Sequence, residues 1–422
     1  MPGPRRIGFM VAVAAALTSS ATGQVKPRAR DLGIPLDGTP GANNAITDVA
    51  GVEVGYTTLI RGEGKRIVGQ GPVRTGVTAI LPRGKATLEP VFAAFYAGNG
   101  NGDMTGTHWI EETGVLETPI MITNTLSVGT VRDAVVDWMV KRNAPGPFWY
   151  PVVAETSDGG LNDMKGLHVK PEHAFQALES ARGGQIAEGN VGGGTGMNCH
   201  GFKGGTGSAS RVLAQTDGGY TVGVLVQCNY GTRSQLRVAG IPVGREIKDV
   251  DPCVEQLVDP PLKAFDGTQI PLCRPAPVPV RPSGGPSEDP EQGSIIIVAA
   301  TDAPLSPDQL KRMVRRVALG LGRMGSINGN GSGDIFIAFS TANRGVDWGN
   351  SGRSTLPAPT MQRLGSGLMD PIFTATVEAT EEAILNALVA AETMTGADYR
   401  RAWALPHDQV RAILAKYNRL VR

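Results

Sequence analysis

The sequence has few aromatic residues, few histidines and almost no net charge, and each shortage argues against a class of function. Phe, Tyr and Trp make up 5% of the 422 residues, too few for a platform that stacks nucleic-acid bases or sugars. A net charge of +1, with scattered basic residues, offers no electrostatic footprint for nucleic acid. The five histidines show no metal-ligand spacing beyond His168 and His173, so no metal site is predicted.

Cysteine is also scarce, with four residues in the chain. Cys253 and Cys273 flank a proline-rich segment, and a disulfide between them would hold its two ends together. Cys199 and Cys228 lie in glycine-rich or strand-like surroundings, where we expect small buried thiols. A disulfide requires an oxidising compartment, so this prediction depends on export of the protein.

Long apolar runs are absent except near the N-terminus. There, residues 7–17 form an apolar run that follows Arg5 and Arg6 and precedes the small residues 21–23. This order is typical of a cleaved export signal, and the run is too short for a permanent membrane anchor. We therefore predict a signal peptide over residues 1–23 and a periplasmic or secreted mature protein without a membrane segment. The pattern leaves open whether export uses the Sec or the twin-arginine route.

Glycine, in contrast, is abundant. The 57 glycines are roughly double the usual share and predict many tight turns and close backbone approaches. The glycine-rich runs at 192–196 and 204–207 resemble phosphate-binding loops, but neither continues as Gly-Lys-Ser/Thr, so no nucleotide site is predicted. A hydrophobic content of 41% and a charged content of 19% indicate a globular protein with an ample core.

Apolar strand-like runs alternate with glycine-rich turns and amphipathic helices, which is typical of layered α/β structure. The predicted strands include residues 73–81, 119–125, 220–227, 294–301 and 335–339. The predicted helices cover residues 132–141, 171–182, 307–325 and 372–394. The third of these begins with Ser306 as N-cap, and Gln309 closes a capping box.

Residues 248–293 differ from the rest of the chain because they contain a cluster of prolines. Proline has no amide donor, so we expect this segment to lack a regular strand ladder and to form an inserted surface loop rather than a second domain. A loop of this length in a compact protein usually has a function of its own.

The most informative segment is Gly329-Asn330-Gly331-Ser332-Gly333-Asp334, which places a serine at the start of a buried strand. If the Gly331–Ser332 bond breaks, Ser332 becomes an N-terminal residue with two catalytic groups. Its hydroxyl is the nucleophile, and its α-amine, with a pKa of about 7.7–8.0, takes the proton. The alternative is a glycine-rich turn before a strand. We interpret Asp334 as a residue that fixes the turn or the new N-terminus.

Further motifs accompany this segment: AETSDG at 154–159, EGNVGGGTGM at 188–197, GFKGG at 201–205, LVQCNYG at 225–231, ATDAP at 300–304, FSTAN at 339–343 and EATEEAI at 378–384. With these motifs the chain resembles the self-cleaving serine aminopeptidases, the family of the L-aminopeptidase/D-amidase/D-esterases and the β-aminopeptidases (peptidase family S58). The resemblance extends from about residue 28 to residue 394, apart from the 248–293 loop.

This resemblance implies a four-layer αββα sandwich like that of N-terminal-nucleophile hydrolases, with different strand connectivity. It also implies self-cleavage at Gly331–Ser332 into an α chain, 24–331, and a β chain, 332–422, that together form one domain. The implied substrates are small peptides, amides or esters, without a cofactor, and the implied assembly is a homotetramer of αβ units.

The resemblance also assigns roles to single residues. Ser332 matches the family nucleophile, and Asn229 matches the asparagine whose side-chain amide lines the oxyanion hole. Glu155 matches the acidic residue that holds the free amino group of the substrate. Lys203 matches a lysine near the site in related amide hydrolases. Ser157 stands where some members carry an aromatic residue, which implies either a more open substrate pocket or the loss of a contact between a hydroxyl and a carbonyl group, so the substrate preference of the family does not carry over directly.

In the family a serine and a glutamate two residues apart polarise the nucleophile. The best match in this chain is Thr376 with Glu378, where threonine keeps the hydroxyl but the spacing from Ser332 is longer than expected. Glu381 and Glu382 compete for the role of the glutamate.

Three functions stay open on the sequence alone. The first is an exported aminopeptidase. The second is an amide hydrolase of the same fold that acts on non-peptide or cyclic amides and therefore needs no free amine. The third is an uncleaved binding protein with the 248–293 loop as its partner surface. The sequence does not distinguish L-α, D-α and β-amino acid substrates, and it does not identify the leaving group.

Overall fold

The computed structural model of the chain describes residues 26–263, 267, 269–273, 291–346 and 360–421. The predicted signal peptide, 1–23, and much of the proline-rich loop lie outside this part. No helix in the described part is long and apolar enough to cross a bilayer.

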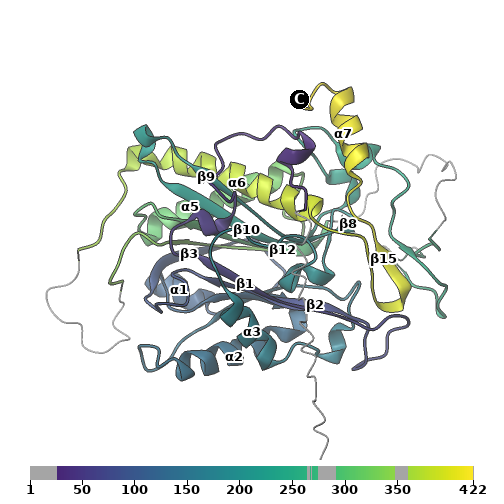
Figure 1. Ribbon diagram of the computed structural model, residues 1–422, viewed down its shortest axis with the longest axis horizontal. Helices are drawn as coiled ribbons and strands as arrows, with labels where there is room; N and C mark the ends of the chain where they lie inside the picture. The colour runs from purple at the N-terminus through teal and green to yellow at the C-terminus, as the bar shows by residue number, and fades with distance from the viewer. Residues whose placement is uncertain (1–25, 264–266, 268, 274–290, 347–359, 422) are drawn as a thin grey trace, which may run out of the picture.

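The described residues form four layers, helix–sheet–sheet–helix, as Figure 1 shows. Helices α2 and α3 cover one sheet, α5 and α6 cover the other, and the two sheets pack face to face, which confirms the predicted αββα sandwich. The helix bounds are α2 Val128–Lys141, α3 Pro171–Ser180, α5 Pro307–Arg323 and α6 Met369–Val389.

The first sheet has four strands in the order β1-β2-β5-β6, with bounds β1 Glu53–Arg61, β2 Val73–Leu81, β5 Ile120–Asn124 and β6 Val152–Thr156. The second has six strands in the order β4-β3-β13-β12-β10-β9, with bounds β3 Val91–Gly100, β4 Val115–Leu116, β9 Gly205–Val212, β10 Thr221–Tyr230, β12 Gln292–Thr301 and β13 Gly331–Ser340.

Shorter elements complete the fold: α1 Thr107–Thr113, α4 Val243–Glu246, α7 His407–Lys416, β7 Asn198–Cys199, β8 Phe202–Lys203, β11 Cys253–Val254, β14 Met394–Thr395 and β15 Arg400–Ala402.

Local sequence explains the central elements. All nine residues of β2 are buried because helices cover one face and the second sheet covers the other, so apolar residues occur on both faces of its second half, 77–81. Helix α5 starts where predicted, with Pro307 in its first turn and the Ser306 amide donating to Gln309 Oε1 at 3.2 Å. Its apolar positions face the six-stranded sheet.

The proline-rich loop is more ordered at its start than we predicted. Cys253 and Val254 form β11, which pairs with β15 of the C-terminal hairpin. Neither residue is a proline, so both keep the backbone amide that strand pairing needs. The predicted disulfide between Cys253 and Cys273 is present, and it ties this strand to a later part of the loop, residues 269–273.

The prediction that Cys199 and Cys228 are thiols is wrong, because the structure joins them in a disulfide. The two residues are 29 positions apart in sequence, with Cα atoms 5.7 Å apart. The short hairpin of β7 and β8 brings them together, since it packs against β10 and the His200 amide donates to the Tyr230 carbonyl at 2.7 Å. Nothing in their sequence spacing indicates this contact.

Helix α6 packs closely against β9 at Gly207. A Cβ atom at this position would clash with the helix backbone at Ala383 and Ala387. We expect Gly207→Ala to lower the free energy of unfolding by about 1–3 kcal/mol, measured by urea denaturation. Gly129→Ala in α2 is the control, because a Cβ there meets nothing within 4 Å. Equal losses in the two variants would contradict this packing.

Candidate active site

Ser332 lies in the first residues of β13, the strand between β3 and β12 in the six-stranded sheet. Its side chain is buried, and its amide donates to the Gly329 carbonyl at 2.8 Å, which closes a tight turn over the predicted cleavage point. In the sheet Ser332 pairs with Gly293 of β12. The sequence prediction of a serine at the start of a buried strand is therefore confirmed.

The Ser332 hydroxyl donates a hydrogen bond to Asp334 Oδ1 at 2.6 Å. The two side chains meet because residues two apart on a strand share one face of the sheet. Asp334 is buried, and burial raises the pKa of its carboxyl group to about 7, an effect that the hydrogen bond from Ser332 only partly offsets. We expected Asp334 to fix the turn or the new N-terminus, and its hydrogen bond with Ser332, the predicted new N-terminal residue, fits the second of these roles.

Two asparagines at the end of β3 hold the carbonyl groups around the predicted cleavage point. Asn101 Nδ2 donates to the Gly331 carbonyl oxygen at 2.9 Å. Asn99 Nδ2 donates to the Asn330 carbonyl oxygen at 3.2 Å and also to the carbonyl of Ser332. Sequence reasoning missed both residues. The available signal was the polar Asn-Gly-Asn stretch directly after an apolar strand.

Glu155 reaches the same region from the facing sheet, at the end of β6. Its carboxylate is buried and accepts hydrogen bonds from the Asp103 amide at 3.1 Å and from the Thr125 hydroxyl. A Cβ atom on Gly102 would lie 3.1 Å from Glu155 Oε1 and 3.4 Å from the Gly333 Cα, so Gly102 sits between Glu155 and the residue after Ser332. The structure thus brings Glu155 close to Gly333, the residue that follows Ser332.

The buried carboxyl group of Glu155 has the properties of a binding site for a cation. Burial raises the pKa of its carboxyl group, and the hydrogen bonds from Thr125 and Asp103 offset part of that effect. Glu155 forms no ion pair within the described residues. A substrate ammonium group would supply the missing positive charge.

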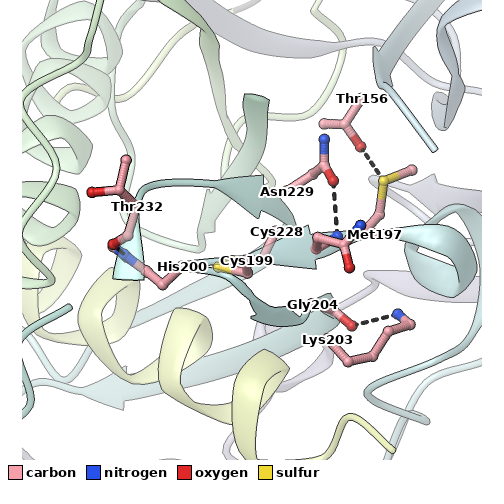
Figure 2. The surroundings of a disulfide bond; sticks show 10 residues. Thr156, Met197, Cys199, His200, Lys203, Gly204, Cys228, Asn229 and Thr232 are labelled. Carbon is pink, nitrogen blue, oxygen red and sulfur yellow. Dashed lines mark hydrogen bonds between the residues drawn. A yellow bond between two sulfur atoms is a disulfide. The ribbon is translucent and has the colours of Figure 1, made fainter. Parts of the chain in front are cut away.

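Asn229 lies near the end of β10, two strands from the nucleophile. It pairs with Ser294 of β12, which pairs with Gly333 of β13, so its Cα is about 10 Å from that of Gly333. Asn229 Oδ1 accepts the Asn198 amide at 2.9 Å, which fixes the orientation of the side chain and turns Nδ2 away from Asn198 (Figure 2). Nδ2 is then the group that can donate to an oxyanion.

Lys203 lies on β8, where it pairs with Asn198. Its buried Nζ donates to the Gly204 carbonyl at 2.8 Å, as Figure 2 shows, and to the Gly194 carbonyl at 3.4 Å. Burial lowers the pKa of this amine to about 7. Ser157, in contrast, is exposed beyond β6 and contacts the Met164 sulfur at 3.9 Å.

The structure does not bring Thr376 and Glu378 to Ser332, so the role that we assigned to this pair is not supported. The Thr376 hydroxyl donates to the Ile372 carbonyl of its own helix at 2.7 Å. Glu378 lies 3.5 Å from Arg211, which pairs with Val222 at the opposite end of the sheet. Asn229 is seven residues farther along β10 than Val222, or about 23 Å.

The competing glutamates have structural partners as well. Glu382 forms a buried ion pair with Arg211 at 2.8 Å and a second pair with Arg30 at 2.9 Å. Glu381 pairs with Arg323 of α5 at 2.9 Å. The physical reason for the wrong assignment is that sequence spacing says nothing about which end of a long helix lies over the nucleophile.

No group of three or more His, Cys, Asp or Glu side chains within the described ranges has the arrangement of a metal site. The groups around Ser332 are instead hydrogen-bond donors, a buried base and a carboxylate for a cation. This set can carry out acyl transfer on a substrate that bears an amine.

Comparisons with known proteins agree with this chemistry. A model of peptidase family S58 matches residues 44–402. The chain is 53% identical over 412 residues to the beta-peptidyl aminopeptidase BapA of Sphingosinicella microcystinivorans, across 98% of each chain. A solved beta-aminopeptidase of Burkholderia sp. matches with a TM-score of 0.78 at 44% identity, over 92% of this chain and 99% of that chain.

A second solved structure is the L-aminopeptidase D-Ala-esterase/amidase of Ochrobactrum anthropi, which is described as a prototype of the serine aminopeptidases and a variant of the N-terminal-nucleophile hydrolase fold. It matches with a TM-score of 0.79 at 43% identity, over 94% of this chain and all of that one (100%). Self-processing is characteristic of these enzymes. The chain therefore belongs to peptidase family S58, the self-processing serine aminopeptidases of the N-terminal-nucleophile hydrolase fold.

Proposed function

We propose that this aminopeptidase cuts itself between Gly331 and Ser332 and then releases N-terminal β-amino acids from short peptides, amides or esters. The observation that carries the proposal is the position of Glu155 and of Gly333, the residue after Ser332, at the ends of facing strands and on either side of Gly102. A nucleophile and an unpaired carboxylate at a fixed separation select a substrate whose amine and scissile carbonyl have the matching separation.

In the mature enzyme the Ser332 hydroxyl attacks the substrate carbonyl and its α-amine takes the proton. Asn229 Nδ2 donates to the oxyanion, and Glu155 binds the substrate ammonium. The α-amine then returns the proton to the leaving group, and water hydrolyses the acyl-enzyme. These steps use the side chains of this chain alone and require no cofactor.

The preference for β-amino acids is supported by the names of the relatives at 53% and 44% identity. A β-amino acid has one more carbon atom between its amine and its carbonyl than an α-amino acid. A rigid separation between Glu155 and Ser332 therefore discriminates between the two classes, because only one of them can contact both groups at once.

Mass spectrometry and kinetics on the purified wild-type protein test the proposal. We expect two fragments, the smaller starting at Ser332. With matched p-nitroanilides of β-homoalanine, L-alanine and D-alanine, we expect the highest kcat/KM for the β compound. Cleavage at Gly331–Ser332 with a preference for an α compound would overturn the substrate assignment and leave the maturation step intact.

Asn229→Ala tests the oxyanion role. Removal of one preorganised donor should lower kcat on the order of 10²-fold with little change in KM, measured by steady-state kinetics of the matured variant. Asn343→Ala is the control, because its side-chain amide bonds Gln362 beyond the far end of β13. A rise in KM at unchanged kcat would instead assign Asn229 to ground-state binding.

We also propose that the enzyme is exported and assembles as a homotetramer of αβ units. The pattern of residues 1–23 supports export, and so do the two disulfides among the described residues, because such bonds persist in oxidising compartments. Fractionation of the source cells tests the location. Light scattering after gel filtration tests the assembly, and a mass other than that of four αβ units would contradict it.

A further inference from the structure

Self-cleavage needs a base that the mature enzyme does not need. Before the Gly331–Ser332 bond breaks, the nitrogen of Ser332 is an amide and cannot take a proton from the hydroxyl. The precursor must therefore use another group for the first proton transfer. In the uncut chain β13 runs continuously through Gly331 and Ser332, so the groups available at this stage can be identified directly.

We infer that Asp334 is the general base of self-cleavage and that Asn101 binds the oxyanion that forms on Gly331 in the same step. This inference rests on the proposed cleavage at Gly331–Ser332, and it concerns the precursor rather than the hydrolysis of substrates.

Asp334 has the contact that a base requires, because its Oδ1 already accepts the Ser332 hydroxyl proton at 2.6 Å. Two other titratable groups act electrostatically on this part of the strand. Glu291 is occupied by the Ser326 hydroxyl and by the Ile327 amide at 2.9 Å. Burial, together with the negative charges of Asp334 and Glu291, raises the pKa of the Tyr230 phenol, so this group stays protonated.

Asn101 has the contact that an oxyanion donor requires. Its Nδ2 lies 2.9 Å from the carbonyl oxygen of Gly331, the atom on which negative charge develops during attack. Asn99 donates to the carbonyl groups of Asn330 and Ser332, which flank Gly331, and not to the Gly331 oxygen itself. The scissile carbonyl thus has one side-chain donor of its own within the described residues.

Self-cleavage proceeds in two stages, an acyl shift and the hydrolysis of the resulting ester. The Ser332 oxygen attacks the Gly331 carbonyl carbon, and its proton moves to Asp334. The carbon–nitrogen bond then breaks, the nitrogen takes the proton from Asp334, and an ester joins Gly331 to the Ser332 oxygen. Water hydrolyses the ester to a Gly331 carboxylate and a free Ser332, whose α-amine is the base of the mature enzyme from then on.

The pH dependence of maturation in Asp334→Asn tests the base. Full-length precursor from cell-free translation is shifted to buffers from acid to alkaline pH, and the two fragments are quantified over time. The base form of Asp334 is the carboxylate, so the wild-type rate should rise with pH and level off above the pKa of about 7. Asp334→Asn should mature on the order of 10²-fold more slowly and lose this rise. Asp334→Glu should recover part of the rate and the pH dependence.

Asn101→Ala tests the oxyanion donor in the same assay. It should slow maturation on the order of 10²-fold and leave the pH midpoint unchanged, because the base is still present. Asn99→Ala is the matched control, with a smaller effect, since it removes bonds to the flanking carbonyls only. Equal slowing by the two variants would overturn the role of Asn101.

The outcomes separate this inference from the proposed function. If the wild-type chain is not cut before Ser332, the proposed function fails and the inference fails with it. If the wild-type chain is cut and Asp334→Asn matures at the same rate with the same pH profile, the inference alone is overturned. A comparison of the melting temperatures of Ser332→Ala and Ser332→Ala/Asp334→Asn shows whether the second change damages the fold of an uncleavable precursor.

Discussion

The Ser332→Ala chain is expected to remain a single polypeptide without measurable aminopeptidase activity. The substitution removes the hydroxyl that bonds Asp334 at 2.6 Å and would attack the Gly331 carbonyl. It thereby removes the nucleophile of maturation and of catalysis together, so the loss is complete rather than partial. Intact-mass spectrometry of the purified variant beside the wild type is the measurement.

Ser340→Ala is a matched control on the same strand. Its buried hydroxyl donates to the Ala303 carbonyl at 2.6 Å, at the opposite end of β13 from Ser332. This variant should still produce two fragments. An uncut chain in the wild type and in Ser332→Ala alike would remove the serine from the mechanism and restore the interpretation as a binding protein.

Glu155→Gln is expected to lower kcat/KM for substrates with a free amine by about 10²–10³-fold, because a buried ammonium without its counter-charge costs about 3–5 kcal/mol. Glutamine keeps the shape and can still accept the hydrogen bonds from Thr125 and the Asp103 amide. Maturation should proceed as in the wild type, because the internal substrate at Gly331 has no free amine. Parallel assays on an aminoacyl anilide and on its N-acetyl derivative provide the measurement.

The pH dependence gives a second test of Glu155. Burial raises the pKa of this carboxyl group above its ordinary value. The carboxylate form binds the ammonium, so wild-type kcat/KM should fall as the pH drops through that raised pKa. In Glu155→Gln the part of the acid limb that comes from Glu155 should be absent, and the part that comes from the Ser332 α-amine should remain. A variant that keeps its activity, beside a wild type that cleaves the free-amine and the acetylated substrates equally well, would instead support an amide hydrolase that does not require an amine.

The parts of the fold that the sequence predicts are those fixed by local chemistry. The residues of β2, many of them β-branched, and the capping box of α5 specify their elements within a few residues, and the glycine-rich lead identifies Ser332. Each depends on neighbours in the chain. The four-layer arrangement came from the family resemblance rather than from these local patterns.

The contacts that the sequence did not predict join residues from different strands. Asn101 reaches Gly331 because β3 pairs with β13, and Cys199 reaches Cys228 because a short hairpin folds against β10. Thr376 and Glu378 fit a pattern by spacing, but α6 places them over the end of the sheet away from Ser332. Side-chain types alone cannot specify such pairings, because register and helix direction decide them.

The position of β13 has a consequence for how the active enzyme is made. This strand is paired along its length with β12 on one side and β3 on the other, so the proposed cut at its first residues would leave the two pieces bound by both ladders. If the pieces were synthesised separately, each would expose unpaired strand edges, which favour aggregation. Cleavage at this position would therefore let a single gene product deliver two polypeptides in equal amounts, already assembled, and no active chain would exist before its own fold is complete.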